Sequence, residues 1–260
     1  MRILLSNDDG IDAPGLKALQ NIAAQLSDDV WTVAPETNHS GAGHSLSLRE
    51  PLRMRQIDER TYAVRGTPTD CIIMGVRHIM ADKRPDLILS GVNMGQNLAE
   101  DLTYSGTIAA AFEGTLIGIR GIAMSQSLGI GGRTPGAKRG PDWTTCTTHA
   151  PDVIRKLLTL DWPAYTLYNI NFPDCAPDEV QGLQVTSQGR RDQEVLNIDE
   201  RHDTWGTPYY WLGFLQRRSN AVEGTDLRAV YDGHISVTPL TMNLTATNML
   251  EGTKSVLGKS

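Results

Sequence analysis

Short apolar runs alternate with amphipathic segments through the first half of the chain. Residues 2–6 form an apolar run that ends in the polar tetrapeptide Asn-Asp-Asp-Gly. Residues 14–26 repeat apolar side chains at helical spacing and begin with a proline, which predicts an amphipathic helix. Residues 30–34 form the next apolar run, so the first part of the chain predicts a strand, a helix and a second strand.

The same alternation continues further along the chain. Strands are predicted at residues 62–64, 86–90 and 121–124, and helices at residues 69–80 and 107–116. Regular alternation of this kind is typical of an α/β fold, with a mostly parallel sheet and helices on both of its faces.

The pattern changes after about residue 125. Residues 129–141 are rich in glycine, proline and basic side chains and predict an exposed loop. A helix follows at 151–158, and strands follow at 165–172, 209–215 and 234–239. Because the last part is richer in strands, we divide the chain into a core of residues 1–180 and a β-rich hairpin and C-terminal arm of residues 181–260.

Composition narrows the class of protein. The chain has 260 residues, of which 40% are hydrophobic and 21% are charged, as in an ordinary globular protein. The formal net charge is −6 and no basic run is present, which argues against binding to long nucleic acid.

The N-terminal apolar run and the cysteines bear on location. Three apolar residues, Ile3 to Leu5, precede the polar tetrapeptide, too few for a signal peptide or a membrane span. The three cysteines are Cys71, Cys146 and Cys175, and they form no C-x-x-C motif. That usage fits a reducing compartment, so we expect a cytoplasmic protein that does not associate with a membrane.

The first candidate for chemistry is the Asn-Asp-Asp-Gly segment at residues 7–10. Ligands of open parallel sheets bind beyond the carboxyl ends of the strands. Two adjacent carboxylates repel each other unless a cation joins them, and oxygen-rich sites suit Mg²⁺ or Mn²⁺. The alternative is an Asp-Gly turn with a solvated acidic pair.

Two further polar loops follow predicted strands. Residues 35–48 read PETNHSGAGHSLSL, and residues 90–97 read SGVNMGQN. The first offers hydroxyl groups and glycines, among them Gly41, that let the backbone approach an anion, while the second offers amide oxygens. His39 and His44 are candidates without the spacing of a helical metal pair. Each loop alone is explained as a flexible turn, but three such loops at one sheet edge favour a site.

A helix start supplies the fourth candidate. Tyr-Ser-Gly-Thr at residues 104–107 leads into the apolar helix predicted at 107–116. Free backbone N–H groups and the positive end of the helix dipole make such a start a phosphate site. N-capping by Ser105 or Thr107 uses the same groups and is the alternative. The motifs of P-loop proteins, G-x-S-x-G hydrolases, H-E-x-x-H proteases and G-x-G-x-x-G dehydrogenases are absent from the sequence.

Taken in order, these segments resemble the SurE family of survival proteins. The resemblance rests on NDDG at 7–10, HSGAGHSLSL at 39–48, GTPTDC at 66–71, SGVNMGQN at 90–97 and YSGTIAAAFEG at 104–114, and it continues in YNINFP at 168–173 and HISVTPL at 234–240. It therefore spans nearly the whole chain. One departure is the PETNH segment before Ser40, where relatives often carry Asp and Arg after the proline.

The resemblance implies the roles of individual residues. One divalent cation per subunit, Mg²⁺ or Mn²⁺, would be bound by Asp8, Asp9, Ser40 and Asn93. Of these, Asp8, Asp9 and Asn93 are the expected catalytic residues. The phosphate of the substrate would be bound by Asn97, Ser105, Gly106, Thr107 and Gly41.

The resemblance also implies a fold and an assembly. The family fold is a Rossmann-like domain with a β-hairpin and a C-terminal extension that subunits exchange, which gives homodimers or homotetramers. In this chain the exchanged parts would be residues 190–215 and residues from about 225 onward.

The activity implied is that of a metal-dependent 5′-nucleotidase. It would hydrolyse nucleoside 5′-monophosphates to nucleoside and phosphate by metal-activated water, with 3′-monophosphates and polyphosphate as further candidate substrates. Attack by Asp8 through an aspartyl-phosphate is the mechanistic alternative. A non-catalytic nucleotide-binding protein and a phosphotransfer switch on the same fold are the alternative functions.

Overall fold

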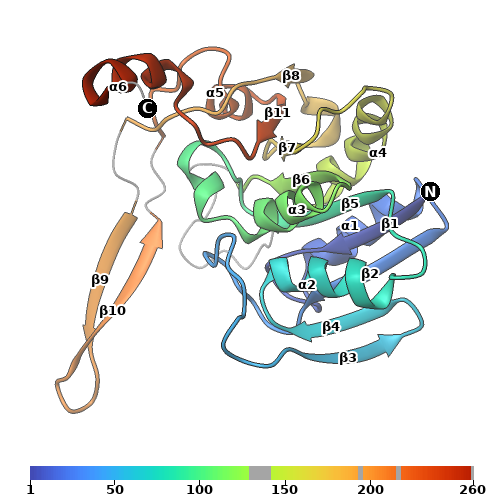
Figure 1. Cartoon of the computed structure of the whole chain (residues 1–260). Helices are drawn as coiled ribbons and strands as arrows, with labels where there is room; N and C mark the ends of the chain where they lie inside the picture. Colours follow the sequence, from blue (N-terminus) through green and yellow to red (C-terminus); the bar gives the residue numbers. More distant parts are fainter. Residues whose placement is uncertain (129–141, 193–195, 215–217, 259–260) are drawn as a thin grey trace.

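In the described residues, the architecture is a large sheet flanked by helices, with a separate two-stranded hairpin. The computed structural model describes residues 1–128, 142–192, 196–214 and 218–258. The sheet has nine strands in the order β3-β4-β2-β1-β5-β6-β7-β11-β8 (Figure 1). The strands are β1 (Arg2–Ser6), β2 (Asp29–Pro35), β3 (Arg53–Asp58), β4 (Thr61–Arg65), β5 (Leu87–Met94), β6 (Arg120–Gln126), β7 (Thr166–Phe172), β8 (Leu183–Val185) and β11 (Ile235–Thr241).

Helices connect these strands. The α-helices are α1 (Pro14–Ala24), α2 (Pro68–Met74), α3 (Gly106–Leu116), α4 (Thr144–Leu158), α5 (Asp226–Tyr231) and α6 (Leu250–Leu257). Four short helical segments are η1 (Gly75–Ile79), η2 (Ala99–Thr103), η3 (Pro177–Glu179) and η4 (Thr247–Met249). In the described part of the chain, no helix is long and apolar enough to cross a membrane.

The middle of the sheet is parallel and the edges are mixed. Strands β4, β2, β1, β5, β6 and β7 pair in parallel, whereas β3 runs antiparallel to β4 and β11 antiparallel to β7. The predicted α/β class with a mostly parallel sheet is confirmed. A parallel sheet is buried on both faces, which explains why its strands read as continuous apolar runs.

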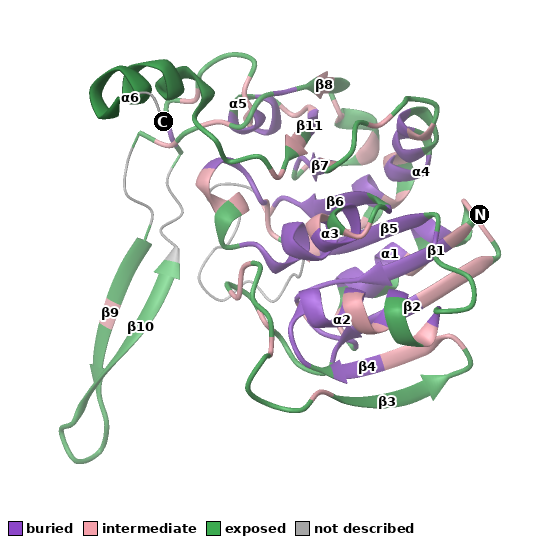
Figure 2. Cartoon of the chain, in the orientation of Figure 1, coloured by how far each residue is buried: buried purple, intermediate pink, exposed green. Residues whose placement is uncertain are grey.

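Strand β1 shows how the two faces are covered. Ile3 and Leu5 point into the core with α1 and α4, while Leu4 between them packs on the opposite face with α2. All three side chains are fully buried, and the central strands are buried over most of their length (Figure 2). Helix α3 also packs on the Leu4 face, through Ala110. Successive strand residues point to opposite faces, so one tripeptide contributes to both layers.

The chain reverses its direction of travel across the sheet at β1. From β1 it moves outward through β2 to β4, and it then returns to place β5 on the other side of β1. The gap between β1 and β5 is therefore the topological switch point, where open α/β sheets bind their ligands. The polar turns after β1 and at the end of β5 both lie there.

Several predicted elements change their limits. The helix predicted at 69–80 is divided into α2 and η1, and the helix predicted at 151–158 begins earlier, at Thr144, with Pro151 inside it. The strand predicted at 86–90 continues to Met94, with an irregular register between Ser90 and Asn93. The loop predicted at 129–141 lies outside the described residues.

Residues after 180 contribute two strands to the main sheet and also form a hairpin that extends from it. Strands β9 (Leu196–His202) and β10 (Pro208–Phe214) pair into an antiparallel hairpin that extends away from the body (Figures 1 and 2). Strands β8 and β11 belong to the main sheet, and α5 packs beside β11. The segment after Thr241 and the hairpin are therefore the peripheral parts of the described chain, and the exchanged arm from about residue 225 stays a prediction. The division at residue 180 stays a prediction.

Close packing at the start of α1 gives a test of the fold. A Cβ added at Gly15 would lie 1.9 Å from the carbonyl oxygen of Val92, next to the switch point. We expect Gly15→Ala to lower the free energy of unfolding by about 1–3 kcal/mol, because backbone on both sides must move. Urea unfolding followed by circular dichroism measures the change.

Gly252→Ala is the matched control. Gly252 lies in α6, and a Cβ there would meet nothing within 4 Å. The control should leave stability unchanged or raise it by less than about 1 kcal/mol. Equal losses in the two variants would contradict the packing described here.

Candidate functional site

The turn after β1 places two carboxylates at the switch point. The Asn7 side chain donates to the Gly10 carbonyl oxygen at 2.8 Å, and Gly10 adopts a φ of +104°, which favours glycine. The backbone N–H of Ile11 then donates to Pro35 O at 2.8 Å and ties the turn to the end of β2. Asp8 and Asp9 consequently occupy the carboxyl edge of the sheet.

Asp8 lies directly beneath the start of α3. It is only 4% exposed, and its Oδ1 accepts a hydrogen bond from Thr107 Oγ1 at 2.6 Å. A Cβ added at Gly106 would lie 2.7 Å from the Asp8 Cβ, so this close approach of helix to turn requires glycine. Burial raises the pKa of Asp8, while the Thr107 hydroxyl and the backbone amides of Thr107 and Gly106 act to lower that pKa.

Asp9 is the more accessible carboxylate of the pair. Burial, and next the charge of Asp8, raise its pKa to about 6. Hydrogen bonds from the Met94 backbone N–H to Oδ2 at 3.2 Å and from Asn38 Nδ2 to Oδ1 at 3.3 Å act in the opposite direction. Asp9 thus connects the turn after β1 to the end of β5 and to the loop after β2.

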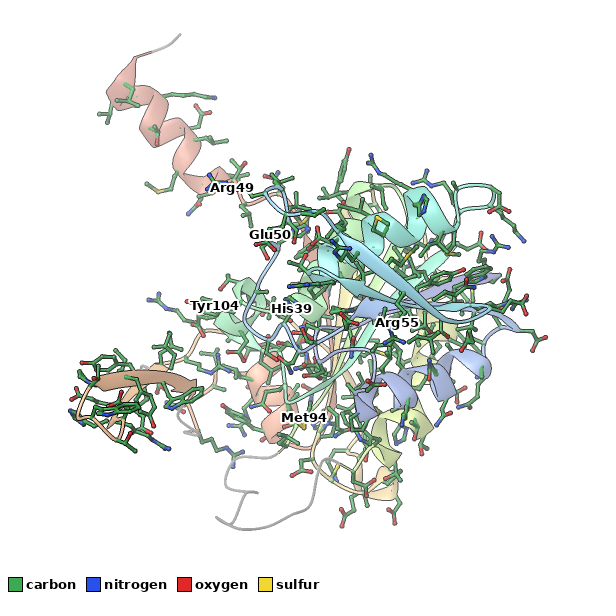
Figure 3. All side chains as sticks on the ribbon, turned by 90° about the horizontal axis from the view of Figure 1, so that it is seen from below. His39, Arg49, Glu50, Arg55, Met94 and Tyr104 are labelled. Atoms are coloured by element: carbon green, nitrogen blue, oxygen red, sulfur yellow. The ribbon has the colours of Figure 1, made fainter. Side chains whose placement is uncertain are left out.

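The loop after β2 brings Ser40 beside the carboxylates. The backbone N–H of His39 donates to Asp8 O at 2.7 Å, and the backbone N–H of Ser40 donates to Asn38 Oδ1 at 2.8 Å. Asn38 therefore bridges Ser40 and Asp9 through the two ends of one amide. Figure 3 shows the labelled His39, Met94 and Tyr104 on the side of the body that faces the hairpin.

Asn93 lies near the C-terminal end of strand β5 rather than in the loop that follows the strand. It lies within β5, one residue before Met94, whose backbone N–H contacts Asp9. Its Nδ2 donates to Gly95 O at 2.8 Å, so the amide nitrogen is occupied and the oxygen is the atom that could act as a ligand. Contacts therefore join the segments that carry all four predicted metal ligands.

The donor set fits a hard divalent cation. Within the described ranges, no group of three or more His, Cys, Asp or Glu side chains could hold a metal. The four predicted ligands are instead two carboxylates, one hydroxyl and one amide, which are oxygen ligands of the kind that Mg²⁺ and Mn²⁺ prefer. The buried Asn7 Oδ1, which has no hydrogen-bond partner, and the raised pKa values of Asp8 and Asp9 are consistent with positive charge at this edge.

Comparisons with known proteins show the family of the chain. The family described as "Survival protein SurE" matches residues 3–195. The chain belongs to the SurE family. It is 58% identical over 245 residues to the 5′-nucleotidase SurE of Methylorubrum extorquens (strain PA1), with 94% of each chain covered. It is 54% identical over 258 residues to the 5′-nucleotidase SurE of Parvibaculum lavamentivorans, covering 99% of this chain and 91% of the relative.

A solved structure of the family has the same fold. The crystal structure of the SurE protein from Aquifex aeolicus superposes with a TM-score of 0.83 at 40% identity, covering 99% of this chain and 100% of that one. Members of the SurE family are generally metal-dependent. The recognition made from the sequence motifs is confirmed.

The structure also places the residues expected to bind phosphate. Ser105 is the N-cap of α3, and its Oγ accepts from the Ile108 N–H at 3.1 Å. Helix capping, the alternative role of this residue, is therefore present. Gly106 and Thr107 form the first turn above Asp8. Gly41 adopts a φ of +80° in the Ser40 loop, with open space around its Cα. Of these residues, Thr107 and Gly106 contact Asp8, and Gly41 follows in the loop that the His39 N–H joins to Asp8 O.

Asn97 is held in a buried polar network. Its Nδ2 donates to Ser125 Oγ at 2.9 Å, and its backbone N–H donates to Asn171 Oδ1 at 2.9 Å. Asn169 and Asn171 both donate to the Asn97 carbonyl oxygen. The network holds the segment between β5 and η2 in place. This segment leads through η2 into the first turn of α3.

Two contributions escaped the sequence analysis. Asn38 was treated only as part of a polar loop, although its position two residues before Ser40 was a usable signal. The YNINFP motif contains Asn169 and Asn171 but does not indicate their contacts with Asn97, which cross 72 and 74 residues of chain.

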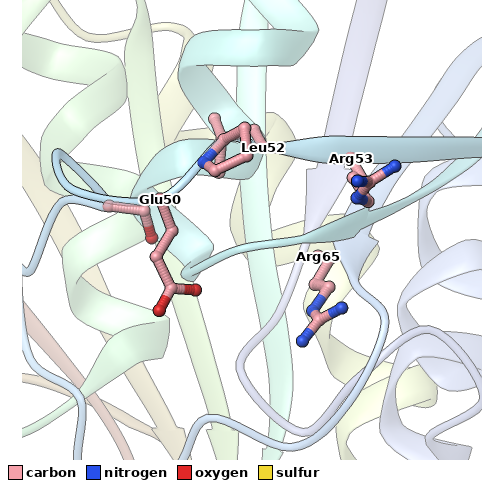
Figure 4. Close-up of a pocket in the computed structure, with 6 residues that line it drawn as sticks. Glu50, Leu52, Arg53 and Arg65 are labelled. Carbon is pink, nitrogen blue, oxygen red and sulfur yellow. The ribbon is translucent and has the colours of Figure 1, made fainter.

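A separate hollow of about 170 Å³ lies beside the site loop. Its lining consists of Ser47, Glu50, Pro51, Leu52, Arg53 and Arg65 (Figure 4). None of the predicted site residues lines it. The predicted site at Asp8 and Asp9 is therefore separate from this hollow.

The raised pKa of Asp9 predicts a pH-dependent stability for the metal-free protein. In the folded chain the carboxyl binds a proton more tightly than in the unfolded chain, whose pKa is 3.8. Its contribution to stability is therefore present below about pH 4 and lost as the pH rises through about 6. In EDTA at pH 7, Asp9→Asn should raise the free energy of unfolding by about 1–2 kcal/mol, after allowance for partial exposure.

Urea unfolding of both proteins at pH 4 and pH 7 measures this effect, which should shrink at the lower pH. Asp29→Asn is the control with the opposite sign, because a hydrogen bond from Arg2 lowers the pKa of Asp29. That variant should be less stable than the wild type at pH 7. A loss of stability in Asp9→Asn at pH 7 would contradict the prediction.

Proposed function

We propose that this protein is a divalent-metal-dependent 5′-nucleotidase that hydrolyses nucleoside 5′-monophosphates to nucleoside and phosphate. The observation that carries the proposal is the meeting of Asp8 and Asp9 with the first turn of α3, where Thr107 contacts Asp8 at 2.6 Å. Relatives at 54% and 58% identity named 5′-nucleotidase SurE support it. No observation favours a non-catalytic nucleotide-binding protein or a phosphotransfer switch.

The cation would be held by Asp8, Asp9, Ser40 and Asn93, one per subunit, as Mg²⁺ or Mn²⁺. When bound, it supplies the positive charge that polarises a phosphoryl oxygen and lowers the pKa of water. The two carboxylates are adjacent and partly desolvated, so a cation relieves their repulsion. This relief is the physical reason for assigning Asp8 and Asp9, while Ser40 and Asn93 are assigned from the family resemblance.

The remaining steps belong to the residues of the chain itself. The first turn of α3, with Ser105, Gly106 and Thr107, binds phosphate oxygens through backbone N–H groups and the helix dipole. Asn97 and Gly41 flank that position. Asp8 and Asp9 lie at this edge, and either carboxylate can accept the proton of an attacking water. Asp8, held by Thr107, stays fixed and orients the site.

Assembly and location follow from surface features. The β9–β10 hairpin exposes Ile198, Trp211 and Leu212, at 65%, 60% and 76% of their surface. Such a projection is costly in water, so we infer that a second copy of the chain covers it in a homodimer or homotetramer. The free cysteines Cys71, Cys146 and Cys175 support a cytoplasmic location.

Phosphate release from a panel of nucleoside 5′- and 3′-monophosphates and polyphosphate tests the proposed activity. We expect release from 5′-monophosphates with Mn²⁺ or Mg²⁺, loss of release in EDTA, and recovery when metal is restored. The panel ranks the substrates. A folded protein that releases no phosphate with either metal would contradict the enzyme and favour a binding protein.

Asp8→Asn tests the assignment of the site. The substitution removes one charge from the cation site, so we expect turnover to fall by about 100-fold or more with the circular dichroism spectrum unchanged. Asp58→Asn, on the exposed strand β3, is the matched control and should keep full activity. Equal activity of the two variants would show that the site lies elsewhere.

A further inference from the structure

Helix α3 carries a carboxylate that the proposed chemistry does not use. Glu113 lies in the apolar sequence GTIAAAFEGTL and is only 8% exposed. A buried carboxylate is unfavourable unless it is hydrogen-bonded or paired. The contact that Glu113 makes is from Oε2 to Nε2 of His44, at 3.1 Å. A loop residue thus reaches into the side of the helix.

The position of Glu113 relates it to the site. It comes seven residues after Gly106, which is close to two helical turns, so both residues lie on the same face of α3. Gly106 is the residue that packs against Asp8. The His44 contact is therefore on the face of α3 that meets the carboxylates, about 10 Å further along the helix axis.

Ser40 lies between two attachment points of its loop. Residues 36–52 form no helix or strand, so their course depends on individual contacts. Before Ser40, the His39 N–H is bonded to Asp8 O. After it, the Gly43 N–H donates to Tyr104 O at 3.1 Å, and His44 contacts Glu113. Gly43 and Gly41 adopt φ values of +56° and +80°, which let the segment arch between these points.

We propose that His44 and Glu113 form a clamp that holds the Ser40 hydroxyl in position at the metal site, with Glu113 as a positioning residue. The proposal rests on the proposed function, since it takes Ser40 as a metal ligand. Ser40 is exposed and sits beside a glycine, so without a fixed loop its hydroxyl has many orientations. Replacing a residue that holds a metal ligand in place commonly weakens metal binding by about tenfold or more.

The outer half of the loop has its own attachments. Thr67 Oγ1 donates to Ser45 O at 2.8 Å, and the Ser47 N–H donates to Asp70 Oδ1 at 3.2 Å. Thr67 and Asp70 are also the capping box of α2. Loss of the His44 contact therefore loosens the segment after Ser40, which keeps the Gly43 bond to Tyr104, while residues 45–47 stay bound to α2. A variant at His44 should keep the fold.

Mn²⁺ titration of the full-length protein by calorimetry, without substrate, tests the clamp. His44→Ala and Glu113→Ala should each weaken Mn²⁺ binding by about 10-fold, and the double variant should lose no more than either single one. His44→Gln keeps an N–H donor toward Glu113 and should restore affinity to within about 3-fold. Should Glu113→Ala fail to fold, the two His44 variants decide the matter.

Glu36→Gln is the matched control. Glu36 begins the same loop, is 45% exposed and lies 3.8 Å from Arg55, so its loss removes one carboxylate without touching the clamp. It should bind Mn²⁺ as the wild type does. Wild-type affinity in His44→Ala would overturn the clamp alone. Absence of Mn²⁺ binding by the wild type would overturn the metal site of the proposed function, and the clamp with it.

Discussion

The burial of two adjacent carboxylates at the end of β1 is the constraint on which the rest of the site depends. Asp8 is almost fully buried, and its charge together with burial raises the pKa of Asp9 to about 6. An arrangement of this kind lowers stability in the absence of a cation. Hydrogen bonds from neighbouring elements offset part of this loss of stability. Asp8 accepts from the Thr107 hydroxyl at the start of α3, and Asp9 accepts from the Asn38 amide and the Met94 backbone N–H.

Sheet topology explains why these partners are available. The chain leaves β1 in one direction and returns on the other side with β5, so the ends of both strands open into one gap. Helix α3 follows β5 and can approach the gap because Gly106 carries no side chain. The loop after β2 also lies at this edge of the sheet, where the His39 backbone N–H donates to Asp8 O. The loop after β2, the end of β5 and the start of α3 are far apart in the sequence, yet all three contact Asp8 or Asp9.

The sequence predicted the parts of the fold whose burial is simplest. Strands β1 and β5 were found because both of their faces are covered and their residues are apolar. Strand β3 was missed, since RMRQID is exposed at every position and has no alternation to detect. The motifs led to Asp8, Asp9 and Asn93, whereas the Asn38 bridge and the Asn169 and Asn171 contacts depend on pairings that only the folded chain brings together.

The central claim is that the edge formed by β1, β5 and the Ser40 loop binds one divalent cation. Anomalous diffraction from crystals grown with Mn²⁺ tests it most directly, because the manganese signal locates the ion without reference to activity. The account predicts one strong peak per subunit in contact with oxygens of Asp8, Asp9, Ser40 and Asn93. A well-occupied peak elsewhere, with none at this edge, would contradict it.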